Sequence, residues 1–199
     1  MKIQKSSIIV GIVVVVVAGL FGGMFSWQPR KSTQQVNQAQ IKTLNDQPTS
    51  SIPTDWKLYS SDTIGFSMYY DPLLTLQEDS KTDVRFYKQG PTQRGQTEMY
   101  DGMIVTVRKV DVVGDAQAYI NNQIEQYKNI GSITEPLHDS KLNGISMKEY
   151  SASGLGDAKM IFVPIDNQTL LEVSYMVPDP TNAGFQKVVD SMLSTFKLK

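Results

Sequence analysis

The stretch LHDSKLNGISMKEYS, residues 137–151, decides the fold because it predicts two strands joined by a tight turn. Its Asn143-Gly144 pair is the dipeptide most typical of a two-residue hairpin turn, in which both central residues adopt positive φ. The flanking segments 137–142 and 145–151 are therefore expected to pair as antiparallel strands. This hairpin indicates that the surrounding chain builds an antiparallel sheet.

Further strands are predicted on both sides of this hairpin. A second pair is expected at 159–165 and 169–177, where Asp166-Asn167-Gln168 supplies the turn. The stretch 89–102 has no apolar periodicity and predicts a long loop, whereas Ser153-Gly-Leu-Gly156 predicts a hairpin turn and lacks the ending of a phosphate loop. The upstream strands are expected at 56–60, 64–70, 73–78, 84–88 and 103–110.

Two helices are predicted from apolar spacing of 3.6 residues. The first spans 115–129 and is expected to end at a cap formed by Gly131. The second is expected to begin with Asp179 as N-cap and Pro180 as its first residue. Its apolar stripe predicts a face buried against the sheet, formed by Phe185, Val188, Val189, Met192 and Leu193.

These elements predict an α+β fold in which an antiparallel sheet is flanked by helices. A last strand at Phe196–Leu198 is expected to close the sheet. The globular domain is predicted to span residues 56–199, which is long enough for a substantial apolar core.

The first 27 residues predict a transmembrane signal-anchor. Ile8 to Phe25 form eighteen residues without a charge, and a helix of that length reaches ~27 Å, close to the ~30 Å core of a bilayer. A cleaved signal peptide is the alternative, but its apolar region is about 7–15 residues long and ends at small residues. Lys2 and Lys5 favour an amino terminus on the cytoplasmic side and a domain on the outer side.

Residues 28–55 predict a flexible polar tether. They contain six Gln, three Pro and few large apolar side chains, so they cannot bury enough surface to offset their ordering entropy. A flexible chain of this length has a typical reach of ~30 Å. The first 55 residues carry five basic and two acidic side chains, against 14 and 18 in the remainder, so two differently charged regions are joined.

Several local strings resemble the PsbP-like domain family. Gly65 to Pro72, read GFSMYYDP, is similar to the opening of these domains, and the ending VVDSMLSTF, residues 188–196, is similar to their final helix and strand. Helix 115–129, the hairpin at Asn143 and Lys148-Glu-Tyr150 also fit. The resemblance covers residues 56–199. It implies an α-β-α sandwich and a non-enzymatic role as a binding or assembly module. The sequence departs from the family in its anchor and in Tyr70-Asp71 before Pro72.

Composition excludes several kinds of chemistry. The chain has 199 residues, no Cys and one His, so thiol nucleophiles, zinc–thiolate sites and multi-histidine metal sites are excluded. A net charge of -1 argues against non-specific nucleic-acid binding. No cofactor is expected.

Candidate chemistry is sparse. His138 is either a surface residue at a strand edge or the base of a hydrolase, oriented by Asp139. The acids Glu78, Asp79 and Asp83 either face solvent or bind a hard cation, although no calcium-loop pattern is present. Five tyrosines have two interpretations: they form either an exposed aromatic platform for a ligand or ordinary core and cross-strand pairs. They are Tyr59, Tyr69, Tyr70, Tyr87 and Tyr100.

We therefore expect a membrane-tethered, extracytoplasmic binding or scaffold domain without catalytic activity. Its expected partners are the bilayer, through residues 8–25, and an unidentified protein. The alternatives are a small-molecule or ion sensor, or a tethered hydrolase that uses His138.

Overall fold

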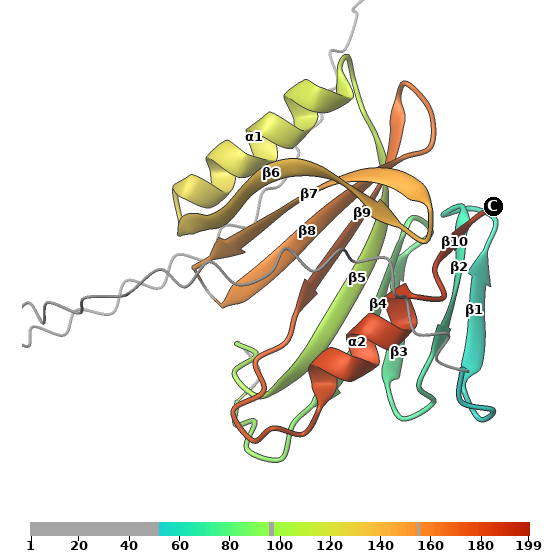
Figure 1. The fold of residues 1–199 in the computed structure, drawn as a ribbon, viewed down its shortest axis with the longest axis vertical. Helices are drawn as coiled ribbons and strands as arrows, with labels where there is room; N and C mark the ends of the chain where they lie inside the picture. Colours follow the sequence, from blue (N-terminus) through green and yellow to red (C-terminus); the bar gives the residue numbers. More distant parts are fainter. Residues whose placement is uncertain (1–51, 96–97, 155) are drawn as a thin grey trace, which may run out of the picture. The chain divides into compact units, whose positions relative to one another are not determined.

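The computed structural model describes residues 52–95, 98–154 and 156–199. The described residues form two helices and ten strands (Figure 1). In chain order these are β1 Lys57–Ser61, β2 Phe66–Tyr70, β3 Thr75–Ser80, β4 Asp83–Gln89, β5 Gly102–Asp111, α1 Ala116–Lys128, β6 Ser132–Leu142, β7 Ile145–Ser153, β8 Asp157–Pro164, β9 Thr169–Met176, α2 Phe185–Leu193 and β10 Lys197–Leu198.

The strands form two antiparallel sheets. The large sheet has the order β3-β4-β5-β9-β8-β7-β6, and β5 pairs with β9 across the segment that holds α1 and three strands. The small sheet has the order β1-β2-β10. The predicted α+β class with an antiparallel sheet is confirmed, whereas the expectation that Phe196–Leu198 closes the main sheet is wrong. That segment pairs instead with Phe66 and Ser67 of β2.

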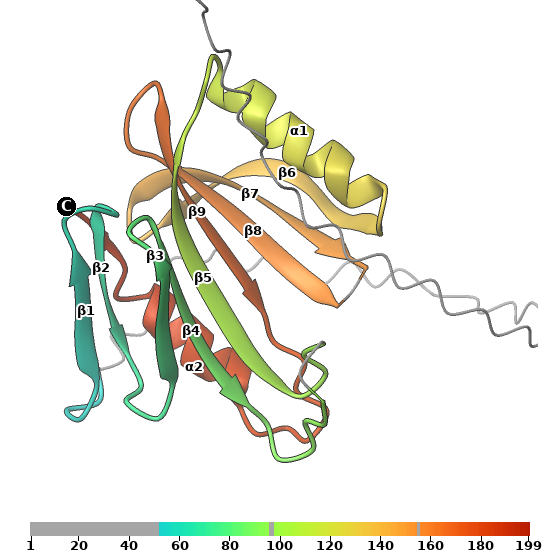
Figure 2. The same cartoon turned by 180° about the vertical axis from the view of Figure 1, so that it is seen from behind.

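The two helices cover opposite faces of the large sheet. Side chains alternate along a strand, and on β8 Met160 and Phe162 belong to the apolar cluster under α1 while Ile161 and Val163 belong to the cluster under α2. We call these the α1 face and the α2 face. Helix α2 lies in front of β4 and β5 in Figure 1 and behind them in Figure 2.

The main core lies between the α2 face, helix α2 and the small sheet. Phe66 of the small sheet stacks on Phe196 with ring centroids 5.5 Å apart, and the predicted stripe of α2 is buried except at Val188, which is partly exposed. The core includes Ile64, Phe66, Met68, Val84, Phe86, Met103, Val105, Val107, Ile161, Val163, Leu171, Val173, Phe185, Val189, Met192, Leu193 and Phe196.

Helix α2 begins later than the sequence predicted. Asp179 and Pro180 do not start it, because Asn182 (φ 52°) and Gly184 (φ 84°) turn the chain before Phe185. The N-cap is Gly184, which makes no side-chain cap hydrogen bond, so the prediction of Asp179 as N-cap is wrong. The Asp179 carboxylate instead accepts hydrogen bonds from the amides of Ala183, Gly184 and Phe185 at 2.6, 2.8 and 3.2 Å and so holds the loop that leads into the helix.

Gly131 also has a different role from the predicted one. Helix α1 spans Ala116–Lys128, within the predicted range 115–129, with Asp115 as N-cap and Asn129 as C-cap. Gly131 is needed for close approach, because a Cβ there would lie 2.1 Å from the carbonyl oxygen of Ser153. The chain just before β6 therefore lies very close to the end of β7, with which β6 pairs.

The Asn143-Gly144 hairpin is confirmed. The two residues adopt φ of 52° and 83° and join β6 to β7 in the predicted register, with Leu142 opposite Ile145. The Asn143 amide also donates to the carbonyl oxygens of Leu193 and Phe196 at 2.9 and 3.0 Å. It thereby satisfies two acceptors at the end of α2, so the hairpin holds the second helix.

Neither described helix is long and apolar enough to span a membrane. The predicted membrane segment Ile8–Phe25 and the tether up to residue 51 lie outside the described residues.

Candidate binding site

The candidate site lies on β6, β7 and β8, on the part of the α2 face beyond the apolar core. On β7, Met147 belongs to that core, and Glu149 stands two residues further along, so it projects from the same face. Strand β6 is an edge strand with register shifts between Ile133 and His138, a region that contains Pro136. These shifts let both Glu135 and His138 turn toward Glu149.

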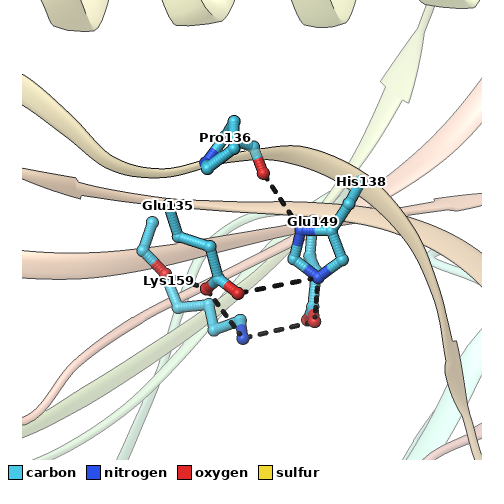
Figure 3. A network of polar contacts seen from close by, with 6 residues as sticks. Glu135, Pro136, His138, Glu149 and Lys159 are labelled. Atoms are coloured by element: carbon cyan, nitrogen blue, oxygen red, sulfur yellow. Dashed lines mark hydrogen bonds and ion pairs between the residues drawn. The ribbon is translucent and has the colours of Figure 1, made fainter. Parts of the chain in front are cut away.

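His138 contacts three acceptors (Figure 3). Its Nε2 lies 3.1 Å from Glu149 Oε1 and 3.8 Å from Glu135 Oε1, and its Nδ1 lies 3.0 Å from the carbonyl oxygen of Pro136. A carbonyl accepts only, as does a carboxylate, so both close contacts are hydrogen bonds when both ring nitrogens carry protons. The Pro136 carbonyl, followed by the two carboxylates, accordingly raises the pKa of His138 against the opposing effect of burial.

Lys159 completes the cluster from β8. Its Nζ lies 3.2 Å from Glu149 Oε1 and 3.6 Å from Glu135 Oε2. Burial opposes the charge of Lys159, but the carboxylates outweigh it and raise its pKa. The Ser151 hydroxyl donates to Glu135 Oε2 at 2.9 Å and is the main cause of the lowered pKa of Glu135. We call Glu135, His138, Glu149, Ser151 and Lys159 the β6–β8 cluster; its charges balance when His138 is protonated.

The contacts of His138 do not form the geometry that a hydrolase would need. Asp139 follows His138 on the same strand and accepts from Lys148 Nζ at 2.7 Å, so it does not orient the imidazole as the hydrolase alternative required. The hydroxyl of Ser151 bonds Glu135 and not His138. His138 therefore stands at a strand edge, as the sequence predicted, with its ring nitrogens directed at acceptors and not at a nucleophile.

The three acids near β3 have different surroundings. Glu78 accepts from the Tyr59 hydroxyl at 3.0 Å, whereas Asp79 forms an ion pair with Arg85 at 2.9 Å. Burial raises the pKa of Asp83, and the nearby Arg108 partly offsets that effect. In the part of the chain that the structure describes, no three His, Asp or Glu side chains are grouped to hold a metal ion.

The tyrosines do not form a common platform. Tyr59 is buried and meets Phe86 edge-on at 5.5 Å, and Tyr70 packs on the same ring at 5.2 Å. Tyr69 and Tyr87 are half-buried, and Tyr100 is exposed. Of this set, Tyr59 and Tyr70 pack in or against the main core.

A groove of about 470 Å³ lies between the β1–β2 turn and the β3–β4 hairpin. The sequence patterns placed Tyr59 among the tyrosines and Glu78 among the acids, and they did not predict this groove. The alternation along β1 and β3 gives the direction of each side chain, but the approach of the two sheets brings them together. The lining residues are Tyr59, Ser61, Thr63, Ile64, Glu78, Ser80 and Lys81.

Comparisons with known proteins concern the fold. No protein-family model and no curated protein matches the chain. Among solved structures it is similar to the solution structure of cyanobacterial PsbP from Synechocystis, at 10% identity and a TM-score of 0.49, over 73% of this chain and 93% of that one. It is also similar to a crystal structure from Bacteroides thetaiotaomicron, at 15% identity and a TM-score of 0.37, over 73% of this chain and 49% of that one. The chain thus spans about half the length of the Bacteroides protein.

Proposed function

We propose that the protein is a membrane-tethered binding domain that acts outside the cytoplasm and carries no catalytic activity. The observation that carries the proposal is the order of three segments: the apolar run Ile8–Phe25, the polar stretch 28–55 and the folded domain. Every backbone polar group must be paired within lipid, so an apolar run of this length is expected to be helical there. The tether then gives the domain a typical reach of ~30 Å from the bilayer.

The β6–β8 cluster supports a binding role over a catalytic one. The side chains of Glu135 and His138 are 46% and 38% exposed, so a partner can reach them. When His138 is protonated, His138 and Lys159 match the charges of Glu135 and Glu149, so the cluster then offers donors and acceptors without an excess charge. A protein partner with polar side chains fits such a surface, and the chain's net charge of -1 disfavours nucleic acid.

Membrane fractionation tests the anchor. The full-length chain is expected in the membrane fraction after carbonate and high-salt washes. A variant with Val14→Lys and Val15→Lys should move to the soluble fraction, because each charge at the centre of a helix costs about 3 kcal/mol on insertion. Soluble, shortened wild-type protein that begins near Trp27 would contradict the anchor.

The orientation is tested with a single introduced thiol, since the chain has no Cys. Val113 lies fully exposed in the loop between β5 and α1, so Val113→Cys should react with a membrane-impermeant maleimide on intact cells. Labelling only after lysis would place the domain on the cytoplasmic side.

Cross-linking in intact cells tests the binding surface. Glu135→Lys should abolish a cross-linked species that the wild type forms. Glu125→Lys makes the same charge change on the outer side of α1, where Glu125 pairs only with Lys128, and should retain that species. Equal cross-linking by both variants would remove the cluster from the proposed interface.

A further inference from the structure

The groove between the two sheets has a built polar floor. The Tyr59 hydroxyl donates to Glu78 Oε1 at 3.0 Å and so joins the small sheet to β3. Burial, together with Glu78, raises the pKa of Tyr59 to about 12, so its hydroxyl keeps its proton at neutral pH and remains a donor. This bond fixes the Glu78 carboxylate at the groove and leaves its Oε2 without a partner among the described residues.

An ammonium group lines the same groove. Lys81 is exposed at the tip of the β3–β4 hairpin and forms no ion pair or side-chain hydrogen bond within the described residues. Glu78 and Lys81 do not pair with each other either. Glu78 lies in β3, whereas Lys81 follows the strand in the turn of the β3–β4 hairpin. The groove thus presents one anionic and one cationic group, both without an ionic partner among the described residues.

Hydroxyl groups also line the groove. Ser61 Oγ accepts from the amide of Ile64 at 3.2 Å, and the same hydroxyl also interacts with Tyr59. Ser80 Oγ lies 3.2 Å from Thr82 Oγ1 near the rim. Such groups bind amide or hydroxyl groups of a ligand, and about 470 Å³ falls within the ~300–1,000 Å³ range of small-molecule sites.

We propose that this groove binds a short zwitterionic peptide, about the size of a dipeptide, with its amino group on Glu78 and its carboxylate on Lys81. A ligand that carries both charges can meet Glu78 and Lys81 together, and the groove's volume of about 470 Å³ leaves room for a peptide bond between those charges. The peptide bond between them meets the hydroxyls of Ser61 and Ser80. The site needs neither the anchor nor the β6–β8 cluster, so it stands independently of the proposed function.

Calorimetric titration of the full-length chain in mild detergent tests this site. The probes are L-seryl-L-serine, its N-acetyl derivative, which lacks the cation, and its carboxyl-terminal amide, which lacks the anion. The free dipeptide should bind about tenfold or more tightly than either capped form, because each capped form loses one charge-assisted contact. Absence of binding by the free dipeptide, or equal binding of all three probes, would overturn the proposal.

Matched variants assign the two ends of the ligand. Glu78→Gln should weaken binding of the free dipeptide about tenfold but barely affect the N-acetyl derivative, and Lys81→Met should spare the amide in the same way. Glu125→Gln and Lys141→Met neutralise exposed charges elsewhere and should bind like the wild type. If all four variants bind alike, the ligand does not occupy this groove.

Discussion

The two faces of the large sheet are covered by one helix each, yet the helices are held by different forces. Helix α2 buries Phe185, Val189, Met192 and Leu193 in the main core, whereas α1 buries Ile120 alone. The apolar cluster under α1 is smaller, and Ile124 and Tyr127, which pack against it, are only partly buried. The α2 face therefore depends on apolar area removed from water.

The α1 face depends more on directional polar bonds. Glu172 on β9 is only 7% exposed, and its carboxylate accepts from Tyr119 Oη at 2.8 Å and from Arg108 Nη2 at 2.6 Å. Burial, with the Glu172 charge, raises the pKa of Tyr119 to about 12, so this hydroxyl remains a donor. The comparison indicates that loss of apolar volume should unfold the domain through α2, and loss of a polar contact should loosen α1.

The largest expected effect comes from Phe185→Ala. Phe185 is 5% exposed in the main core, and truncation of a buried phenylalanine costs about 3–5 kcal/mol, a large share of the ~5–15 kcal/mol that stabilises a typical domain. Thermal unfolding of the full-length chain should show a decrease in melting temperature of roughly 10 °C.

Lys187→Ala is the matched control on the exposed side of α2 and should leave the melting temperature nearly unchanged. If Phe185→Ala unfolds like the wild type but loses a cross-linked partner, α2 is a binding face and the comparison of the two faces fails.

An intermediate effect is expected from Tyr119→Phe. This change removes one donor to the buried Glu172 carboxylate while Arg108 remains, and a hydrogen bond to a charged group contributes about 1.5–3 kcal/mol. Tyr119 is half-buried, so we expect a loss of about 1–2 kcal/mol. Hydrogen exchange should quicken in α1 and not in α2, while Tyr100→Phe at an exposed position should change neither. Equal loss of protection in both helices would show that the two faces unfold as one unit.

The two faces also differ in how far the sequence predicts them. Period-3.6 spacing gave helix α1 and the stripe of α2, and Asn143-Gly144 gave the hairpin and its register, because these signals are local. The pairing of β10 with β2 joins residues about 130 positions apart, and no local pattern specifies such a partner. The α2 start was missed for a related reason, since Asp179 accepts from amides four to six residues away.

The β6–β8 cluster was predictable only at His138 itself. Its position near a strand edge followed from the hairpin, and Asp139 was the obvious neighbour in sequence. The true neighbours, Glu149 and Lys159, come from two further strands. Their convergence depends on register shifts around Pro136, which strand periodicity does not predict.

The smallest expected effect is the pH dependence that His138 adds to the α2 face. Its pKa is raised in the folded protein, first by the Pro136 carbonyl and then by Glu149 and Glu135, with Lys159 as the neighbouring cation. A raised folded-state pKa means that the bound proton favours folding. The stabilisation is therefore complete below the unfolded pKa of about 6.5 and is lost as pH rises through the folded pKa.

His138 is the only histidine, so no other histidine titrates in this pH window, and the α-amino group is common to wild type and variant. The melting temperature of the wild type minus that of His138→Gln should fall between pH 6 and pH 8.5, by less than the change caused by Tyr119→Phe, because the ring is partly exposed. A difference that stays constant with pH would mean that the proton on His138 does not tie β6 to β7.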